Sequence, residues 1–225
     1  MSRIVQVMVL VEGQTEQLFI KNLLSPYLAD FTEPKIILTP TLGGNQGGDV
    51  RFSRYERDIG LHLRQCTDAY VTLMVDYYGI REDWPGLEEA KRQTTHSKKA
   101  EVMNRETAKE VRKRFPEQNS DVRFIPYVSM HEIEALYFSN PAIIAKKLHI
   151  PQKEVESIVR ECGEPEAIND KPQTAPSKRL QNLSPNFKKI TTGIDIAKAV
   201  GIKRMREQCP LFNEWINRIE NLTYA

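Results

Sequence analysis

The sequence predicts an α/β protein in which a parallel sheet of four strands is flanked by helices and followed by a helical C-terminal extension. Short apolar runs alternate with amphipathic segments over residues 1–140, as in a parallel sheet whose strands are joined by crossover helices. Residues 141–225 contain helical patterns without further strands. We therefore expect a sheet domain over residues 1–140 and a helical extension over 141–225 that packs on it.

The predicted strands are apolar runs, as expected for strands that helices cover on both faces. They span residues 4–11, 35–39, 70–75 and 122–128. The first run stops at Glu12 and the third stops at Asp76, whereas the fourth leads into the stretch MHEIEAL. Two buried strands are thus predicted to end on acids.

The segments around the strands carry apolar residues at helical spacing. The helix after the first strand has apolar residues at helical spacing, Ile20, Leu23, Leu24, Tyr27 and Leu28, and we expect Pro26 to kink or shorten its last turn. Further helical patterns cover residues 52–63, 87–115, 141–148, 152–162, 194–205 and 211–222. The polar stretch EPEAINDKPQTAPSKRL predicts a loop, and LGGNQGGD lacks the Gly-Lys-Ser/Thr ending of a phosphate-binding P-loop.

The composition of the chain argues against several classes of protein. The 32 basic and 30 acidic residues nearly cancel, so any surface that binds nucleic acid must be local. Cys66, Cys162 and Cys209 are far apart, which argues against a disulfide framework and a zinc knuckle. No stretch approaches the roughly 20 apolar residues of a membrane span, and the start lacks signal-peptide features. We expect a soluble cytoplasmic protein that does not associate with membranes.

Acids follow three of the four predicted strands. Glu12 and Asp76 end the first and third strands, and Glu132 and Glu134 follow the fourth. The carboxyl ends of parallel strands meet at one edge of a sheet, so these side chains should converge. Glu16 extends the inner helix face backwards by one turn and should lean toward Glu12, although an acid in a first helical turn also complements the helix dipole.

Such a cluster predicts a metal site. Neighbouring carboxylates repel one another and raise each other's pKa unless a cation lies between them. Hard oxygen ligands suit Mg²⁺ or Mn²⁺, which can activate water and stabilise charge on a phosphoryl group. We predict that the metal ligands are Glu12, Glu16, Asp76, Glu132 and Glu134, with Glu12 also a candidate general base.

Two stretches resemble the motifs of Toprim domains. VEGQTEQLF, with Glu12 and Glu16, is similar to their first motif, and VTLMVDYYG, with Asp76, resembles the region of their Asp-x-Asp motif. MVDYYGIREDWPG, MHEIEALYF and PSKRL together resemble a family of small bacterial Toprim-like proteins along nearly the whole chain. The resemblance implies a Toprim fold, dependence on a divalent metal and cleavage of phosphodiesters in DNA or RNA. Many such proteins are encoded beside an AAA or ABC-type ATPase in phage-defence or abortive-infection loci.

The chain departs from the Toprim pattern at one position. Many Toprim enzymes have a second Asp two residues after the first, where this chain has Tyr78. Asp83 could replace it, or Glu132 and Glu134, and we favour the glutamates because they directly follow a strand. The absence of this second Asp makes a site for two metal ions less expected, but it has less effect on the prediction that the acids bind a metal ion at all.

Other side chains are candidates for contacts with a nucleic acid. Cleavage needs positive charge near the scissile phosphate, for which Lys178 and Arg179 are the predicted catalytic cations. Arg51 and Arg54 could hold the backbone, although basic residues in loops are commonly only solvated.

Three aromatic residues and a histidine near the acids could likewise either contact a nucleic acid or serve only the structure. Tyr77, Tyr78 and Trp84 could stack on bases or could cover the core. His131 could orient a water or a phosphate, although a lone histidine at a strand end is more often structural.

The acidic residues, together with what the resemblance to Toprim-like proteins implies, lead to two expected functions. The first is a Toprim-type nuclease dependent on Mg²⁺ or Mn²⁺, acting as the effector of an anti-phage or abortive-infection system with an ATPase partner. The second is a non-catalytic Toprim-like interaction subunit that regulates, or is regulated by, an ATPase, which the departure at Tyr78 favours slightly. The sequence has no ATPase motif of its own, and it leaves open whether the chain forms a homo-oligomer.

Overall fold

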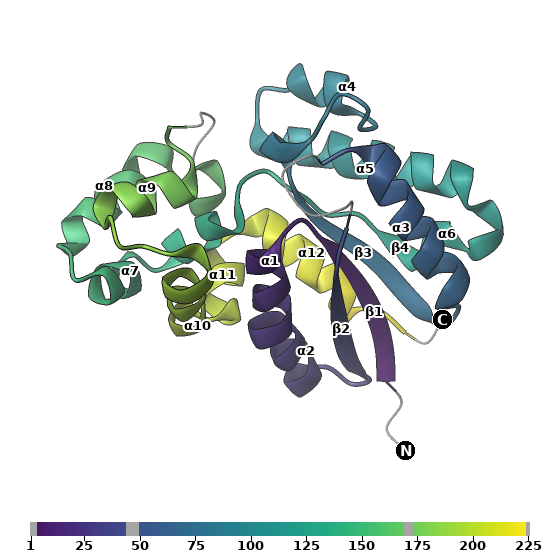
Figure 1. Cartoon of the computed structure of the whole chain (residues 1–225), viewed down its shortest axis with the longest axis horizontal. Coiled ribbons are helices and arrows are strands. Elements are labelled where there is room, and N and C mark those ends of the chain that lie inside the picture. The colour runs from purple at the N-terminus through teal and green to yellow at the C-terminus, as the bar shows by residue number, and fades with distance from the viewer. Residues whose placement is uncertain (1–3, 44–49, 169–172, 224–225) are drawn as a thin grey trace.

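The computed structural model describes residues 4–43, 50–168 and 173–223. Most of the glycine-rich stretch LGGNQGGD lies outside these residues. A parallel sheet occupies the centre of the molecule, with helices on both faces and a group of helices beside it (Figure 1). Its strands are β1 (Ile4–Val11), β2 (Lys35–Leu42), β3 (Ala69–Asp76), β4 (Phe124–Ile125) and β5 (Val128–Ser129).

The strand order is β2-β1-β3-β4, and β5 also pairs with β3. All of these pairings are parallel, so the predicted α/β class with a parallel sheet is confirmed. β3 lies between β1 and the β4 and β5 pair, and its residues from Ala69 to Val75 are buried. A continuous apolar run is what a strand in this position requires.

The fourth predicted strand is shorter and interrupted. Residues Ser120–Arg123 form the short helix α6, and Pro126 separates β4 from β5. Proline has no N–H to donate to a strand ladder, which explains the break. The buried side chain of Arg123 donates hydrogen bonds to the carbonyl oxygens of Leu63, Cys66 and Ala69, and so joins α6 to the start of β3.

The helix after β1 includes the predicted inner residues Tyr27 and Leu28, and Pro26 does not shorten it, since it ends only at Phe31. It consists of α1 (Gln14–Phe19), a π-helical turn η1 (Ile20–Leu24) and α2 (Ser25–Phe31). In the π-helical turn the Ser25 N–H donates to the Ile20 carbonyl. This widened turn lies directly before the proline, whose ring would crowd a regular α-helix.

Two apolar clusters cover opposite faces of the sheet. Val5, Val7 and Val9 of β1 point into one cluster with α1 and α2, whereas Leu10 points into the other. The second cluster includes helices over residues 52–115, and its predicted inner stripe from Ala100 to Phe115 is buried. The elements there are α3 (Phe52–Gln65), η2 (Tyr77–Gly79), α4 (Leu87–Lys91), α5 (His96–Arg114) and η3 (Pro116–Gln118).

The C-terminal part is helical, as predicted, with two differences. The stretch containing PSKRL is helical rather than a loop, and Gly201, at φ +79°, divides the predicted helix 194–205. A 3-10 helix over residues 133–139 leads into this part. The elements are η4 (Ile133–Ser139), α7 (Pro141–Leu148), α8 (Gln152–Cys162), η5 (Pro165–Ala167), α9 (Pro176–Leu183), η6 (Lys189–Gly193), α10 (Ile194–Val200), α11 (Ile202–Gln208) and α12 (Pro210–Glu220). None of the described helices is both long and apolar enough to cross a membrane.

Helix α12 returns to the sheet and joins its core (Figure 1). Trp215 is 2% exposed, stacks on Tyr127 with ring centroids 4.6 Å apart, and donates from Nε1 to Thr72 Oγ1 at 3.0 Å. Phe212 contacts Phe19 edge to face. The helical extension and the sheet therefore share one apolar core.

We predict that Trp215→Ala lowers the free energy of unfolding by about 3–5 kcal/mol, because it leaves a cavity and removes the hydrogen bond that the Thr72 hydroxyl accepts, although this hydroxyl still donates to the Ile125 carbonyl. Phe31→Ala is the control, since that ring is 73% exposed and its loss should cost about 0.5 kcal/mol. Urea unfolding followed by circular dichroism measures both. Equal losses in the two variants would contradict the shared core.

Candidate acidic site at the strand ends

The ends of β1 and β3 bring two acids to one edge of the sheet. Val11 pairs with Met74, so Glu12 and Asp76 follow at neighbouring strand ends. Asp76 Oδ1 accepts a hydrogen bond from the Tyr78 N–H at 3.0 Å, which fixes the turn η2. A Cβ on Gly79 would lie 3.3 Å from both carboxylate oxygens of Glu12, so η2 lies directly against this acid.

Glu16 lies in the first turn of α1 and belongs to the same acidic group. A Cβ on Gly13 would lie 3.1 Å from Glu16 Oε2, which shows that the carboxylate folds back toward the strand end. Burial raises the pKa of Glu16, the negative charge of Glu132 also raises it, and Lys189 lowers it. The predicted approach of Glu16 to the strand-end acids is thus present in the structure.

Glu132 and Glu134 flank the start of η4 and share one lysine. Lys189 Nζ lies 2.9 Å from Glu132 Oε1 and 3.4 Å from Glu134 Oε1. Glu132 Oε2 also accepts a hydrogen bond from the Ser177 N–H at 2.9 Å. Lys189 and Ser177 come from the helical extension, so the extension completes the environment of the acids.

Burial and mutual charge link the five predicted acids electrostatically. Burial raises the pKa of Asp76 to about 7, with Glu12, Glu132 and Glu16 contributing further. Burial likewise raises the pKa of Glu134 to about 7, where the charge of Lys189 opposes it. The pKa of Glu12 is raised by burial and by Glu16. We refer to Glu12, Glu16, Asp76, Glu132 and Glu134 as the acidic site.

Glu132 is the exception in this group. Burial acts to raise its pKa, but the charge of Lys189 and the hydrogen bonds from Ser177 outweigh burial and lower it. The Glu132 carboxylate therefore stays ionised at neutral pH, and its charge raises the pKa of the other four acids.

The predicted cations have other contacts. Arg179 donates to Thr174 O at 3.1 Å and to Glu161 Oε2 at 3.3 Å, which holds it against α8. Lys178 donates to Gln181 Oε1 at 3.1 Å on the exposed surface of α9. In the motif PSKRL it is the Ser177 backbone that contacts the acidic site.

Two other predicted candidates have structural roles. Both carboxylate oxygens of Asp83 accept hydrogen bonds at the start of α3, from the N–H groups of Phe52 and Ser53, which favours Glu132 and Glu134 over Asp83 as replacements for the missing Asp. Trp84 is 2% exposed and donates to Thr107 Oγ1, so it is a core residue and the alternative of base stacking is wrong.

His131, a further candidate from the sequence, is buried beside the rings of His96 and Tyr78.

Lys189 was not among the sequence candidates. It lies in the stretch PNFKKITTG, 57 residues after Glu132, and no local pattern sets it apart from Lys188. Only its position opposite two acids in the folded chain identifies it.

The donor chemistry of the acidic site suits a hard divalent cation, since its oxygens are buried and mutually repulsive. Both carboxylate oxygens of Glu134 lack a hydrogen-bond partner among the described residues. In that same part of the chain, however, no group of three or more His, Cys, Asp or Glu side chains is arranged so that it could hold a metal ion. Cation binding would therefore require these side chains to move closer together.

Comparison with known families gives one match. Residues 11–220 match the family described as Domain of unknown function (DUF4276). The chain belongs to this family. The DUF4276 match runs from β1 to the last residue of α12 and includes the whole acidic site and Lys189. No curated protein and no solved structure matches the chain.

We predict that stability falls as the pH rises from about 5 to about 8. Asp76 and Glu134 have raised pKa values in the folded state, so the folded chain binds more protons than the unfolded chain in this range, and ionisation then destabilises it. Melting temperatures across this range should decline. Glu134→Gln, which cannot ionise, should make the decline shallower.

The control for this experiment is Glu117→Gln, because Glu117 is exposed and should leave the pH dependence unchanged. Glu132 has the opposite effect at lower pH: because its pKa is lowered in the folded chain, its ionisation makes stability rise as the pH rises. Melting temperatures of Glu134→Gln that decline as steeply as those of the unchanged protein would contradict the assigned burial of Glu134.

Proposed function

We propose that this protein is a Toprim-type, metal-dependent nuclease that cleaves phosphodiesters in DNA or RNA. The observation that carries the proposal is the convergence of five carboxylates at one edge of a parallel sheet, where Asp76 and Glu134 have pKa values of about 7. Structural acids are usually exposed or individually paired, whereas two acids of this group, Glu132 and Glu134, share the single cation Lys189. The resemblance of VEGQTEQLF and VTLMVDYYG to Toprim motifs supports the same conclusion.

Glu12, Glu16 and Asp76 would hold Mg²⁺ or Mn²⁺, with Glu132 and Glu134 as further ligands. The ion would supply an activated water and neutralise charge on the phosphate. Burial and the charge of Glu16 raise the pKa of Glu12, which makes its carboxylate a stronger proton acceptor, as a general base requires. Lys189, rather than Lys178 or Arg179, is the cation that the geometry favours for stabilising charge on the scissile phosphate.

The proposed biological setting is a bacterial anti-phage or abortive-infection system in the cytoplasm, in which the nuclease is the effector and an AAA or ABC-type ATPase is its partner. This part of the proposal is supported by the family resemblance of the quoted motifs alone. It requires no membrane association.

We predict that the purified protein cleaves plasmid, single-stranded DNA or tRNA when Mg²⁺ or Mn²⁺ is present. Glu12→Gln and Asp76→Asn should each reduce the cleavage rate by about a hundredfold or more, because each removes a charged ligand without changing side-chain size. Glu117→Gln is the matched control and should cleave at the unchanged rate. Cleavage that persists in Glu12→Gln, or in EDTA, would rule out the proposed site.

Metal binding can be measured without cleavage. We expect Mg²⁺ to raise the melting temperature at about pH 8, since a cation that binds only the folded chain stabilises it and relieves repulsion among ionised carboxylates. The increase should be smaller near pH 5 and absent in Asp76→Asn. An increase of equal size in Asp76→Asn would place the cation elsewhere.

The second candidate function is a non-catalytic interaction subunit. It is favoured by the pairing of Lys189 with both Glu132 and Glu134, which already neutralises part of the acidic site, and by the absence of a ready metal-ligand group among the described side chains. A protein of this kind would bind an ATPase equally well before and after Glu12→Gln and would show no cleavage. Co-purification of the two proteins, with and without the substitution, distinguishes the two functions.

A further inference from the structure

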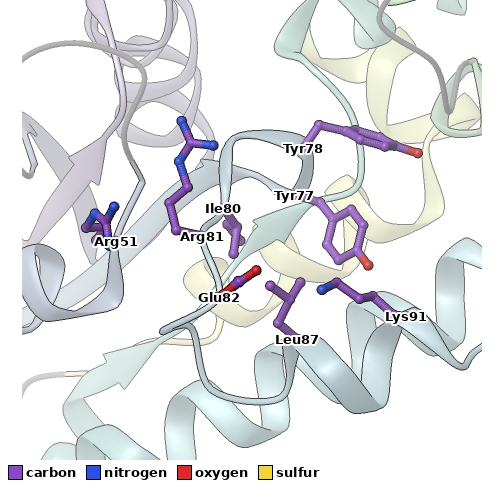
Figure 2. Close-up of a pocket in the computed structure, with 8 residues that line it drawn as sticks. All are labelled: Arg51, Tyr77, Tyr78, Ile80, Arg81, Glu82, Leu87 and Lys91. Atoms are coloured by element: carbon purple, nitrogen blue, oxygen red, sulfur yellow. The ribbon is translucent and has the colours of Figure 1, made fainter.

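A positively charged pocket lies beside the acidic site. It has a volume of about 400 Å³, within the range of small-ligand sites. Figure 2 shows the residues that line it, which are Arg51, Tyr77, Tyr78, Ile80, Arg81, Glu82, Leu87 and Lys91. Tyr77 and Tyr78 directly follow Asp76, and Gly79 lies against Glu12, so the turn η2 forms a wall common to the pocket and the acidic site.

The charge of the pocket is opposite to that of the acidic site. Arg51, Arg81 and Lys91 line it together with a single acid, Glu82. In Figure 2 the two arginines lie on one side of the pocket, and Tyr77 and Lys91 lie on the other. Lys91 is also paired with Glu88 on the exposed surface of α4. A group of this kind attracts phosphate, which the neighbouring carboxylates alone would repel.

The fold holds the two arginines close together although they come from different segments. Val50 forms a parallel bridge with Ile80, and the Arg81 N–H donates to the Val50 carbonyl at 3.0 Å. Asp83 binds the first N–H groups of α3 and so fixes the residues that follow Arg51. The cations therefore lie on a fixed framework, as a preorganised binding site requires.

The pocket also offers surfaces for a planar ring. Ile80 and Leu87 are buried and contribute apolar walls. Tyr78 is 43% exposed, and its ring packs against Tyr77 with centroids 5.5 Å apart. Lys99 Nζ lies 5.9 Å from the centroid of the Tyr77 ring. Aromatic rings interleaved with cations are the combination by which proteins hold unpaired nucleotides.

We propose that this pocket binds one unpaired nucleotide of a nucleic-acid strand, next to the phosphate at the acidic site. Arg51 and Arg81 contact the phosphate of that nucleotide, and Tyr78 stacks on its base. The proposal rests on the proposed nuclease function and narrows its substrate to single-stranded segments, since a base in a duplex is already stacked and paired. Tyr78, which occupies the position of the missing Asp, then serves substrate binding instead of metal binding.

The test is equilibrium binding in EDTA, so that no cleavage occurs. Fluorescein-labelled oligothymidylate and oligouridylate are the single-stranded probes, and a labelled duplex is the comparison. Arg51→Gln, Arg81→Gln and Tyr78→Ala should each weaken binding of a single-stranded probe by about tenfold, whereas Tyr78→Phe should retain it. Arg160→Gln removes an exposed arginine from α8 and is the matched control, with unchanged binding expected.

The outcomes separate this proposal from the nuclease proposal. Binding that depends on Arg51, Arg81 and Tyr78 supports the pocket even if no cleavage occurs, in which case only the nuclease proposal fails. Single-strand binding that is equal in Arg81→Gln and the unchanged protein, equal binding of the duplex, or no binding of any probe would overturn the pocket proposal. Circular dichroism of each variant shows whether it is folded.

Discussion

The structure depends on the shared burial of five carboxylates at the ends of parallel strands. Each of these acids loses solvation, and Glu12, Glu16 and Glu132 repel neighbouring acids. The pKa values of Glu12, Glu16, Asp76 and Glu134 are therefore raised. Lys189 offsets part of this cost because it pairs with Glu132 and Glu134. A group that costs free energy in the folded chain does not serve its stability, which makes these acids the candidates for a functional site.

The same constraint explains why the sheet and the helical extension form one unit. Lys189 and the Ser177 N–H, both from the extension, are needed to balance the charge of Glu132. On one face of the sheet, Trp215 joins the extension to Thr72 and Tyr127. The acidic site therefore depends on residues as far apart in the chain as Glu12 and Lys189, in keeping with a family match that spans residues 11–220.

The turn η2 connects two surfaces of opposite charge. On one side its Gly79 allows the backbone to approach Glu12, and on the other Tyr77 and Tyr78 line the pocket with Arg51 and Arg81. A cation held by the carboxylates would reduce their repulsion of a phosphate held by the arginines. The phosphate would in turn reduce the repulsion between the arginines and that cation. This arrangement suits the proposed cleavage of a single strand better than either surface does alone.

The sequence by itself determined the elements that depend on local periodicity. β1 and the inner face of α12 follow from the spacing of apolar residues, and the convergence of Glu12 with Asp76 follows from the geometry of parallel strands. The apolar pattern of a strand or a helix repeats every few residues, so a short stretch of sequence is enough to specify the element and the residue at its end.

Only the tertiary structure decided which cation meets the acids and where the arginines point. Lys189 lies 57 residues from Glu132, and Arg179 contacts α8 instead of the acidic site. Pro126 divides the fourth strand, and the bridge from Val50 to Ile80 places Arg51 beside Arg81. Long-range pairing of charges has no periodic signal, because any lysine or arginine on a polar segment is locally equivalent until the chain has folded.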